Sequence, residues 1–475
     1  MRTLVLVDGE HFPPVVRAAI DHLPSRVPGA VVVGAALIGG GEKLADTHTS
    51  RFGVPVVGGP GAVDALEAGL RAFGPELIYD LSDEPVLDAR RRLGLAARAL
   101  VAGVPYAGAD FRLDPPPRPR LASKPSVAVL ATGKRTGKTA VASDLARLLA
   151  AQGTPPVIVA MGRGGPPAPE LIDPATFDLS PAGLVALADQ GRHAASDHLE
   201  DALMAGVATV GTSRCGGGLA GAPADDTFAA GVALADARPE PLLVFEGSGA
   251  AVPPVHADAT ILVVPAHADP ELVTGYLGAY RVLLSDVIVV TMAEPSFADS
   301  SAAVSEDAAV SAVGVARKVS IASLERSVRG LSPGIRVVHT VLRPWPLQPI
   351  SGRRVFYVTT APAHAVDLTA GHLESEHNCK VVGTSSHLAS RPELAEDLEG
   401  LDAADVLVVE LKAAAVDLAA RVALERGMEV VFCDNRVVST GGDATFEELA
   451  RATTDLAIER FRTGSSHSVN RDRHP

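Results

Sequence analysis

The fold is decided by residues 126–139, which read SVAVLATGKRTGKT. The apolar start, at 126–131, predicts a buried strand, and an Ala- and Leu-rich pattern that runs to about residue 152 predicts a helix. A glycine-rich turn joins the two. Such a turn binds phosphate because its backbone N–H groups and the positive end of the helix dipole face the anion. The stretch therefore predicts a nucleotide-binding phosphate loop in a domain with a parallel sheet.

We expect this loop to bind ATP. Lys138 would reach the β- and γ-phosphates, and the Thr139 hydroxyl would hold Mg²⁺. Lys134 and Arg135 add positive charge at the mouth of the loop, so they join Lys138 as candidate catalytic residues. The full set of expected ATP-binding residues is Gly133, Lys134, Arg135, Thr136, Gly137, Lys138 and Thr139.

The loop departs from the usual pattern G-x-x-x-x-G-K-[ST], because Thr132 stands where that pattern has its first glycine. In this respect it resembles the variant loops of dethiobiotin synthetases and ParA-like ATPases. The signature lysine of that branch would fall on Gly133, and Lys134 follows one place later. The resemblance implies a central phosphate-loop NTPase domain of the dethiobiotin synthetase and ParA-like branch.

The composition is that of an ordinary globular protein of 475 residues, with 47% hydrophobic and 21% charged residues. At about 150 residues per domain, this length predicts about three domains. Aromatic residues make up only 4% and the formal net charge is −14, so we expect neither a nucleic-acid partner nor binding to an anionic membrane surface. An anionic ligand must then be held by a local basic pocket.

The cysteines and the N-terminus indicate the compartment. Three cysteines lie far apart with no CxxC pair, which argues against a zinc ribbon or a disulfide framework and suits a reducing environment. The apolar run after Met1 is too short for a signal peptide, and no apolar run reaches the roughly 18 residues that a membrane helix needs. We therefore expect a cytoplasmic protein without a membrane segment.

Short Val-, Ile- and Leu-rich runs alternate with helical patterns along the whole chain, which predicts βαβ units and parallel sheets. Prolines at 115–117 mark a linker, and Pro-Trp-Pro at 344–346 marks a second boundary. We therefore expect an α/β protein in which Rossmann-like domains flank the phosphate-loop domain. The expected bounds are 1–122 for the N-terminal domain, 123–346 for the phosphate-loop domain, 347–462 for the C-terminal domain and 463–475 for a flexible tail.

The expected strands follow from the same alternation. In the N-terminal part they are at 3–8, 30–38, 54–57 and 76–80. In the central part they are at 126–131, 156–161, 207–212, 241–246, 259–264, 286–291 and 336–342. In the C-terminal part they are at 354–359, 379–383, 405–410 and 428–433.

A carboxylate, Glu246, ends the apolar strand at 242–246 and is followed by Gly-Ser-Gly. In phosphate-loop enzymes a carboxylate at such a strand end holds Mg²⁺, directly or through water. Glu246 and Thr139 are therefore the candidate metal ligands, and the alternative for Glu246 is a solvated strand end. The stretch also resembles the Glu-Gly-Ala-Gly-Gly run of dethiobiotin and cobyrinic acid synthetases.

Two other strand ends carry arginine and glycine. A run of three glycines can expose its N–H groups, and the planar guanidinium of arginine can bind phosphate through two hydrogen bonds. We expect these residues to bind an anionic substrate, and Arg214 to take part in catalysis as well; the alternative is a pair of flexible surface loops. The residues are Arg163, Arg214, Gly216, Gly217 and Gly218.

The turn after the first strand is a further candidate for substrate binding. It contains Asp8, Glu10 and His11, and open α/β sheets bind ligands at such strand ends. The structural alternative is a capped turn.

Two other polar stretches also have a plain structural interpretation. Asp197 and Glu200 fit a capping box at a helix start. Lys412 follows the strand at 405–410, where it could assist an anion or simply join a strand to a helix.

Four stretches, in this order, resemble cyclic 2,3-diphosphoglycerate synthetase. They are DGEHFPP at 8–14, GKRTGKT at 133–139, RCGGG at 214–218 and ELKAAA at 410–415, and the resemblance extends over essentially the whole chain. It implies an ATP-dependent ligase that converts ATP and 2,3-diphosphoglycerate into the cyclic pyrophosphate, ADP and phosphate. It also implies ATP and Mg²⁺ as cofactors and a homodimer.

Two other functions stay open on the residues alone. One is a ligase or kinase of the dethiobiotin synthetase type that acts on a carboxylate. The other is a ParA-like ATP switch that dimerises on nucleotide. The acidic net charge and the displaced signature lysine disfavour the switch.

Overall fold

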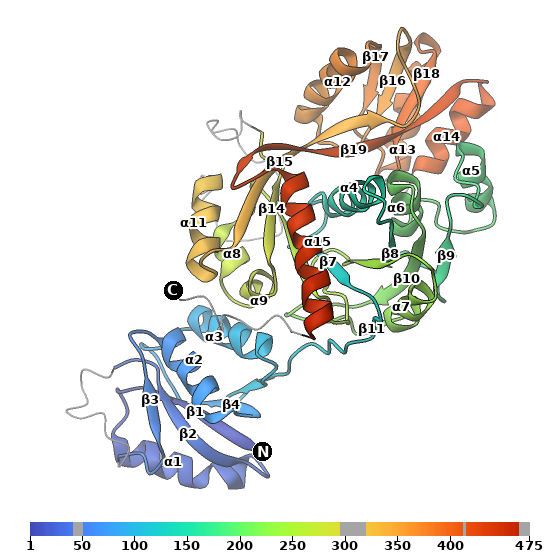
Figure 1. Ribbon diagram of the computed structural model, residues 1–475. Coiled ribbons are helices and arrows are strands. Elements are labelled where there is room, and N and C mark those ends of the chain that lie inside the picture. Colours follow the sequence, from blue (N-terminus) through green and yellow to red (C-terminus); the bar gives the residue numbers. More distant parts are fainter. Residues whose placement is uncertain (41–50, 295–319, 412–414, 465–475) are drawn as a thin grey trace.

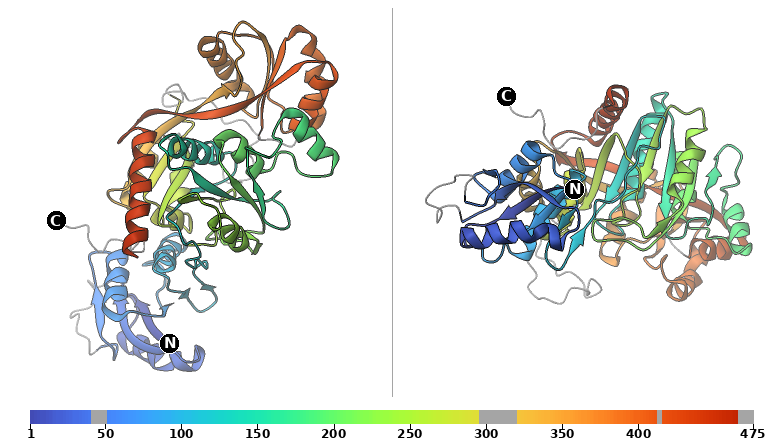
Figure 2. Two further views of the ribbon diagram at one scale, coloured as in Figure 1. Left: turned by 45° about the vertical axis from the view of Figure 1, so that its right-hand side comes forward. Right: turned by 90° about the horizontal axis from the view of Figure 1, so that it is seen from below.

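The computed structural model describes residues 1–40, 51–294, 320–411 and 415–464 (Figure 1). The strands form two sheets, an N-terminal one and a larger one that contains the rest of the strands. In Figures 1 and 2, the N-terminal sheet lies at one end of the molecule and the C-terminal strands at the other. Most neighbouring strands are parallel and helices lie between them in the chain, so the expected α/β fold with parallel sheets is confirmed.

The N-terminal sheet has six strands in the order β3-β2-β1-β4-β5-β6. Its neighbours are parallel except for the antiparallel pair β5 and β6. The strands are β1 (Arg2–Val7), β2 (Val31–Leu37), β3 (Val56–Gly58), β4 (Leu77–Asp80), β5 (Tyr106–Ala107) and β6 (Arg112–Leu113). The helices are α1 (Pro13–Arg26), α2 (Ala62–Phe73) and α3 (Ala89–Val101).

The second sheet has 13 strands, in the order β11-β10-β8-β12-β7-β13-β14-β15-β19-β18-β16-β17, with β9 beside β10. Its central strands are β7 (Ser126–Ala131), β8 (Pro156–Gly162), β10 (Thr209–Cys215), β12 (Leu242–Glu246), β13 (Ala259–Pro265) and β14 (Val287–Thr291), with short β9 (Glu170–Ile172) and β11 (Asp225–Asp226). The helices here are α4 (Lys138–Ala151), α5 (Pro181–Asp189), α6 (Asp197–Ala205), α7 (Phe228–Asp236), α8 (Pro270–Thr274), α9 (Gly278–Leu283) and α11 (Ile321–Leu331). Strands β7, β8, β12, β13 and β14 are buried throughout, as parallel strands covered on both faces should be.

Two strands, β15 (Arg336–Pro346) and β19 (Glu429–Gly442), are longer than the sequence predicted. They form an antiparallel ribbon that joins the central strands to the C-terminal ones. The prediction that these strands end near residues 342 and 433 was wrong. Prolines are tolerated in β15 because β14 pairs with it only over residues 336–339, and beyond this point no other strand of the described residues pairs with that edge of β15.

Beyond β19, the sheet continues with parallel β18 (Val406–Glu410), β16 (Arg354–Val358) and β17 (Lys380–Ser385). Their helices are α12 (Ala363–His377), α13 (Arg391–Asp397) and α14 (Val416–Glu425), with a 3-10 turn at Leu398–Ala403. The last helix, α15 (Phe446–Thr463), returns to the central strands and packs on β7 and β13 (Figure 2). Neither α15 nor any other helix of the described residues has both the length and the apolar character that crossing a membrane requires.

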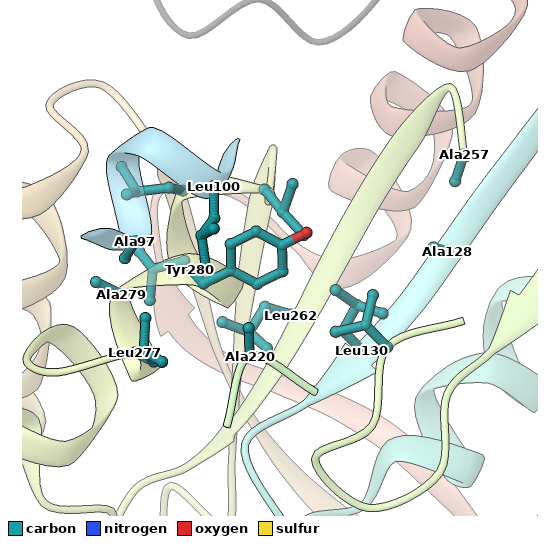
Figure 3. Close-up of a cluster of buried hydrophobic side chains, with 14 of the residues drawn as sticks. Ala97, Leu100, Ala128, Leu130, Ala220, Ala257, Leu262, Leu277, Ala279 and Tyr280 are labelled. Carbon is teal, nitrogen blue, oxygen red and sulfur yellow. The ribbon is translucent and has the colours of Figure 1, made fainter. Parts of the chain in front are cut away.

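The central sheet has an apolar core on each face. One core contains α4 and α15, and the other contains α7 and α9. The second core continues into the N-terminal part of the chain, because α3 packs against α9. At this contact Ala97 and Leu100 of α3 lie close to Leu277, Ala279 and Tyr280 (Figure 3).

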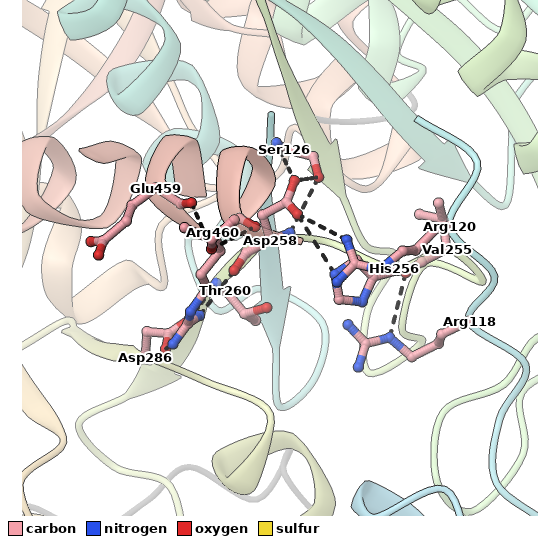
Figure 4. Close-up of polar contacts among 11 residues, drawn as sticks. Arg118, Arg120, Ser126, Val255, His256, Asp258, Thr260, Asp286, Glu459 and Arg460 are labelled. Carbon is pink, nitrogen blue, oxygen red and sulfur yellow. Dashed lines mark hydrogen bonds and ion pairs between the residues drawn. The ribbon is translucent and has the colours of Figure 1, made fainter. Parts of the chain in front are cut away.

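The proline-rich segment at 114–125 contains neither helix nor strand. It is attached to the segment before β13, where the His256 amide donates to the Pro119 carbonyl at 2.9 Å and Arg120 lies 3.4 Å from Asp258 (Figure 4). Asp258 also accepts a hydrogen bond from the Ser126 amide at 3.0 Å. These contacts fix the entry into β7 at the amino ends of the central strands.

Candidate active site

The carboxyl ends of β7, β8, β10 and β12 lie at one edge of the central sheet. The loop at 132–137 connects β7 to α4 and therefore lies at this edge. Gly137 precedes α4 with a φ of 82°, a left-handed conformation that favours glycine. A Cβ atom there would lie 2.9 Å from Cδ1 of Leu342, so the loop also packs closely against β15. The loop thus has the strand, turn and helix around it that phosphate binding requires.

The other loop residues differ in exposure. Thr136 is buried, and its carbonyl accepts a hydrogen bond of 2.6 Å from the Thr291 hydroxyl at the end of β14. Lys134 and Arg135 are exposed at the mouth of the loop. Arg135 has a φ of 55°, a left-handed conformation that costs a non-glycine residue about 1–2 kcal/mol. The loop thus exposes two cations to solvent, while the Thr291 hydroxyl holds its backbone at Thr136.

Lys138, the first residue of α4, forms a buried ion pair with Glu246, the last residue of β12. Burial alone would raise the pKa of Glu246, but Lys138, Asp201 and Thr139 outweigh burial and lower this pKa. Glu246 is therefore a charged carboxylate that is shielded from water and lies beside the phosphate loop.

Sequence reasoning missed a third buried group, Asp201 on α6. Its side chain is fully buried, and the Ser143 hydroxyl on α4 lies 3.2 Å from its Oδ1. Burial first, and then the charge of Glu246, raise the pKa of Asp201 well above its usual range. The available sequence signal was spacing, because His198, Asp201 and Ala205 lie three and four residues apart on the buried face of α6.

The interpretation of Asp197 and Glu200 as a capping box was wrong. The N-cap of α6 is Ser196, whose side chain makes no capping hydrogen bond, and Asp197 is already the first helical residue. Glu200 is buried, because α6 packs against α4 and against β8 and β10. The polar start of this helix is thus enclosed by tertiary packing, which a local capping motif does not reveal.

The oxygen ligands near Lys138 fit a Mg²⁺ ion bound together with nucleotide phosphates. Within the residues that the structure describes, Oε2 of Glu246 and Oδ2 of Asp201 have no hydrogen-bond donor. Buried oxygens without donors are costly unless a proton or a cation lies beside them. Mg²⁺ is usually held by one or two carboxylates and by substrate phosphates, and Thr139 adds a hydroxyl. The described ranges contain no group of three or more His, Cys, Asp or Glu side chains suited to a metal, so phosphate oxygens would complete this site.

A second feature of the same edge is a cluster of cations around Gly249, in the loop after β12. A Cβ atom at Gly249 would lie 3.0 Å from Nη2 of Arg163, 3.7 Å from Cγ of Lys134 and 3.8 Å from Nη2 of Arg214. Arg214 also donates to the Ser248 carbonyl at 2.9 Å. Two segments that follow β7 and β8, together with the end of β10, therefore bring Lys134, Arg163 and Arg214 together, and we call these three residues the cationic rim.

The cationic rim lies close to one carboxylate, because the charge of Asp197, the first residue of α6, acts on Arg214. Burial and the nearby charge of Arg163 both lower the pKa of Arg214. Three cations near a single carboxylate leave a net positive charge, which favours an anion. The predicted glycine run, Gly216 to Gly218, lies next to this rim and is exposed, with Nη1 of Arg214 3.7 Å from the position of a Cβ at Gly217.

The remaining predicted residues lie elsewhere. Asp8 is buried at the end of β1, where its Oδ1 accepts from the Glu10 and His11 amides at 3.0 and 3.1 Å and lies 2.8 Å from Nδ1 of His11. Its Oδ2 accepts from the Asp83 amide at 2.8 Å. These bonds hold a turn on the N-terminal sheet, and a role of this turn in substrate binding stays a prediction.

Lys412 lies outside the described residues.

Family comparisons match nearly the whole chain. Three family models match it: cyclic 2,3-diphosphoglycerate synthetase N-terminal domain at residues 2–114, the P-loop domain of the same synthetase at 126–340, and its C-terminal domain at 346–436. The middle match contains the loop, Asp201, Glu246 and the cationic rim.

Proteins named cyclic 2,3-diphosphoglycerate synthetase are similar over nearly their full length. The protein of Rubrobacter xylanophilus is 44% identical, over 95% of this chain and 98% of its own. The protein of Thermococcus gammatolerans is 42% identical over 94% and 96%, and that of Methanothermobacter thermautotrophicus is 39% identical over 96% and 97%. With a phosphate-loop domain at its centre, the chain belongs to the cyclic 2,3-diphosphoglycerate synthetase family.

Proposed function

We propose that the protein is an ATP-dependent ligase that closes 2,3-diphosphoglycerate into cyclic 2,3-diphosphoglycerate and releases ADP and phosphate. The family and the names of its members support this reaction. The observation within the molecule that carries the proposal is the cationic rim beside the phosphate loop. A phosphate loop accounts for ATP, and three further cations with a net positive charge fit a second polyanion. The substrate has two phosphates and a carboxylate, which matches such a rim.

The phosphate loop would bind ATP through its backbone amides and through Lys138. The amides at Gly133, Thr136 and Gly137 would face the phosphates at the positive end of α4. Arg135, at the mouth of the loop, would contact the γ-phosphate. Thr139, Glu246 and Asp201 would hold Mg²⁺, which neutralises charge on the phosphoryl group that moves.

The reaction needs two transfers and no enzyme nucleophile. An oxygen of one substrate phosphate attacks the γ-phosphorus of ATP, so that ADP leaves and a phosphoanhydride forms. An oxygen of the other substrate phosphate then attacks the phosphorus that is attached to the glycerate, and inorganic phosphate leaves as the ring closes. Lys138 would stabilise the first transition state, and Arg163, Arg214 and Lys134 the second.

Several finer assignments belong to this proposal. The central domain would belong to the dethiobiotin synthetase and ParA-like branch, which the Glu-Gly-Ser-Gly turn after β12 supports. The domain bounds would be 1–122, 123–346 and 347–462, which the ranges of the three family matches support. The protein would act as a homodimer, and the turn with Asp8, Glu10 and His11 would contact substrate from the N-terminal sheet.

The direct test uses the purified protein with Mg-ATP and 2,3-diphosphoglycerate, followed by phosphorus NMR. We expect the two monoester signals to be replaced by two coupled signals in the pyrophosphate region, with one ADP and one phosphate per ring. Monophosphoglycerates should give no ring, because they lack the phosphate that must attack. Formation of ADP without the coupled pair would indicate a kinase or an ATPase instead.

A further inference from the structure

The phosphate-loop lysine is engaged by the protein itself. Lys138 forms an ion pair with Glu246, and both residues are less than a tenth exposed. Lys138 begins α4, directly after the loop that follows β7. Glu246 ends β12, the strand that pairs with β7 in parallel. The pair therefore spans the two elements between which the phosphates of a nucleotide would lie.

Lys138 is the cation beside the two buried carboxyl groups of Glu246 and Asp201, which also lie beside each other. Glu246 contacts Lys138 through Oε1, while its Oε2 has no donor within the described ranges. The same holds for Oδ2 of Asp201, which lies beside Glu246 but forms no ion pair with Lys138 in the part of the chain that the structure describes. Lys138 is thus the cation that neutralises Glu246 in the structure.

We propose that Glu246 holds Lys138 away from nucleotide phosphates until a divalent cation replaces the lysine on Glu246. This inference rests on the proposed use of Mg-ATP at this site. Because Lys138 is one unit charge, it cannot neutralise both a buried carboxylate and the phosphates of ATP. When Glu246 and Asp201 receive Mg²⁺ together with the nucleotide, Lys138 is released to the β- and γ-phosphates. Binding of the metal and release of Lys138 would therefore be coupled. ATP without metal would bind weakly, because Lys138 would still be paired with Glu246.

The test is a double-mutant cycle on ATP binding without metal. Wild-type protein, Lys138→Met, Glu246→Gln and the double variant are titrated with ATP in the presence of EDTA by calorimetry, after circular dichroism has shown that each is folded. If Glu246 holds the lysine, Glu246→Gln should bind metal-free ATP about tenfold more tightly than wild type. Lys138→Met should change the affinity less than about threefold in the wild-type background but weaken it about tenfold or more in the Glu246→Gln background.

This design separates release of the lysine from simple repulsion between Glu246 and ATP. If Glu246 only repels the nucleotide, Glu246→Gln gains the same affinity with or without Lys138, and Lys138→Met has one effect in both backgrounds. That result would overturn the proposal. A Glu246→Gln variant that binds metal-free ATP no better than wild type would also overturn it. If Glu246→Gln does not fold, Glu246→Ala takes its place in the cycle with the same expectations.

Titrations with Mg-ATP complete the test. Mg²⁺ should strengthen ATP binding to wild type about tenfold or more, and this gain should be largely lost in Glu246→Gln and reduced in Asp201→Asn. If wild type binds Mg-ATP no better than Lys138→Met does, the proposed ATP site itself fails, which is a different outcome from failure of the coupling.

Discussion

Two buried strands of the second sheet end in a glutamate, and the two glutamates are in opposite situations. Strand β12 reads LLVFE and ends at Glu246, and β18 reads VLVVE and ends at Glu410; both strands are buried along their whole length. Both side chains are almost inaccessible to solvent. By sequence pattern alone, the two positions are equivalent.

The difference lies in the hydrogen-bond donors. Glu410 accepts from the hydroxyls of Tyr357, Thr359 and Thr360, from the Thr360 amide and from the Asn435 side chain, at distances of 2.7 to 3.2 Å. Neutral donors therefore satisfy both of its oxygens. Glu246 has a lysine on one oxygen and, among the described residues, no donor on the other.

This contrast shows how to recognise a carboxylate that awaits a ligand. A buried carboxylate that neutral groups satisfy completely has a structural role, because bringing a cation there would displace good hydrogen bonds. A buried carboxylate with an oxygen left free, next to a second such carboxylate, remains costly until a cation is bound. The first arrangement stabilises the fold, and the second is compatible with a binding site.

The largest expected effect is on Lys138, the residue that marks the Glu246 region as functional. Lys138→Met should lower kcat with Mg-ATP by about 100-fold to 1,000-fold or more, because a positioned charge at a phosphoryl group is lost from the transition state. Lys380→Met is the matched control, since Lys380 is an exposed lysine of β17 that pairs with Glu374 at 3.1 Å. Steady-state ADP release measures both. Near wild-type turnover of Lys138→Met would contradict the assignment of the phosphate loop.

The next effect compares the two glutamates directly. Glu246→Gln should lower kcat and weaken the dependence on Mg²⁺, with little loss of stability. Glu410→Gln should leave the kinetics of the folded enzyme unchanged but lower the free energy of unfolding by about 1–3 kcal/mol, because the amide NH₂ group would face donors. Metal titrations of the rate and urea unfolding of both variants measure the two quantities. If each variant changed the same quantity, the two sites would not differ in the way that their donors indicate.

The sequence predicted the parts of this site that are encoded locally. The loop, strand β12 and Glu246 follow from short-range patterns, and the meeting of Arg163 with Arg214 follows from the rule that parallel strand ends share an edge. Asp201 could not be found in this way, because its importance comes from the packing of α6 on α4, which brings Ser143 and Glu246 to it.

Local sequence patterns also could not predict the length of the β15–β19 ribbon. Prolines at 344 and 346 normally end a strand, and they are tolerated here because no strand within the described ranges pairs with one edge of β15 beyond residue 339. The full hydrogen bonding of Glu410 likewise depends on residues from β16 and β19 that are distant in sequence. Partners that come from distant segments decide whether a polar residue is structural or functional.

A smaller effect is expected for the cationic rim around Gly249, in the loop that follows Glu246. Arg214→Ala should raise KM for the phosphorylated substrate by about tenfold or more while KM for ATP changes little, because one charged contact worth about 1.5–3 kcal/mol is lost. Arg354→Ala is the control, since Arg354 pairs with Asp405 at 2.7 Å on the C-terminal strands. Equal changes in both KM values would assign Arg214 to the nucleotide or to the fold instead.

The smallest expected effect is on stability and concerns the two regions' left-handed residues. Arg135, at the mouth of the phosphate loop, has a φ of 55°, and Asn378, which ends α12, has a φ of 50°. Strain at Arg135 costs about 1–2 kcal/mol, and glycine costs about 0.5–1 kcal/mol in chain entropy, so Arg135→Gly should stabilise the protein by about 0.5–1 kcal/mol. Arg135→Ala keeps the strain and should not stabilise the protein. Both variants should lose the same activity, because both lack the guanidinium.

The control is Asn378→Gly, which should bring no gain in stability, since asparagine tolerates this conformation and its amide donates to Ser351 at 3.0 Å. Urea unfolding and ADP release of the three variants measure this, and an Arg135→Gly protein no more stable than Arg135→Ala would show that the loop holds Arg135 without strain.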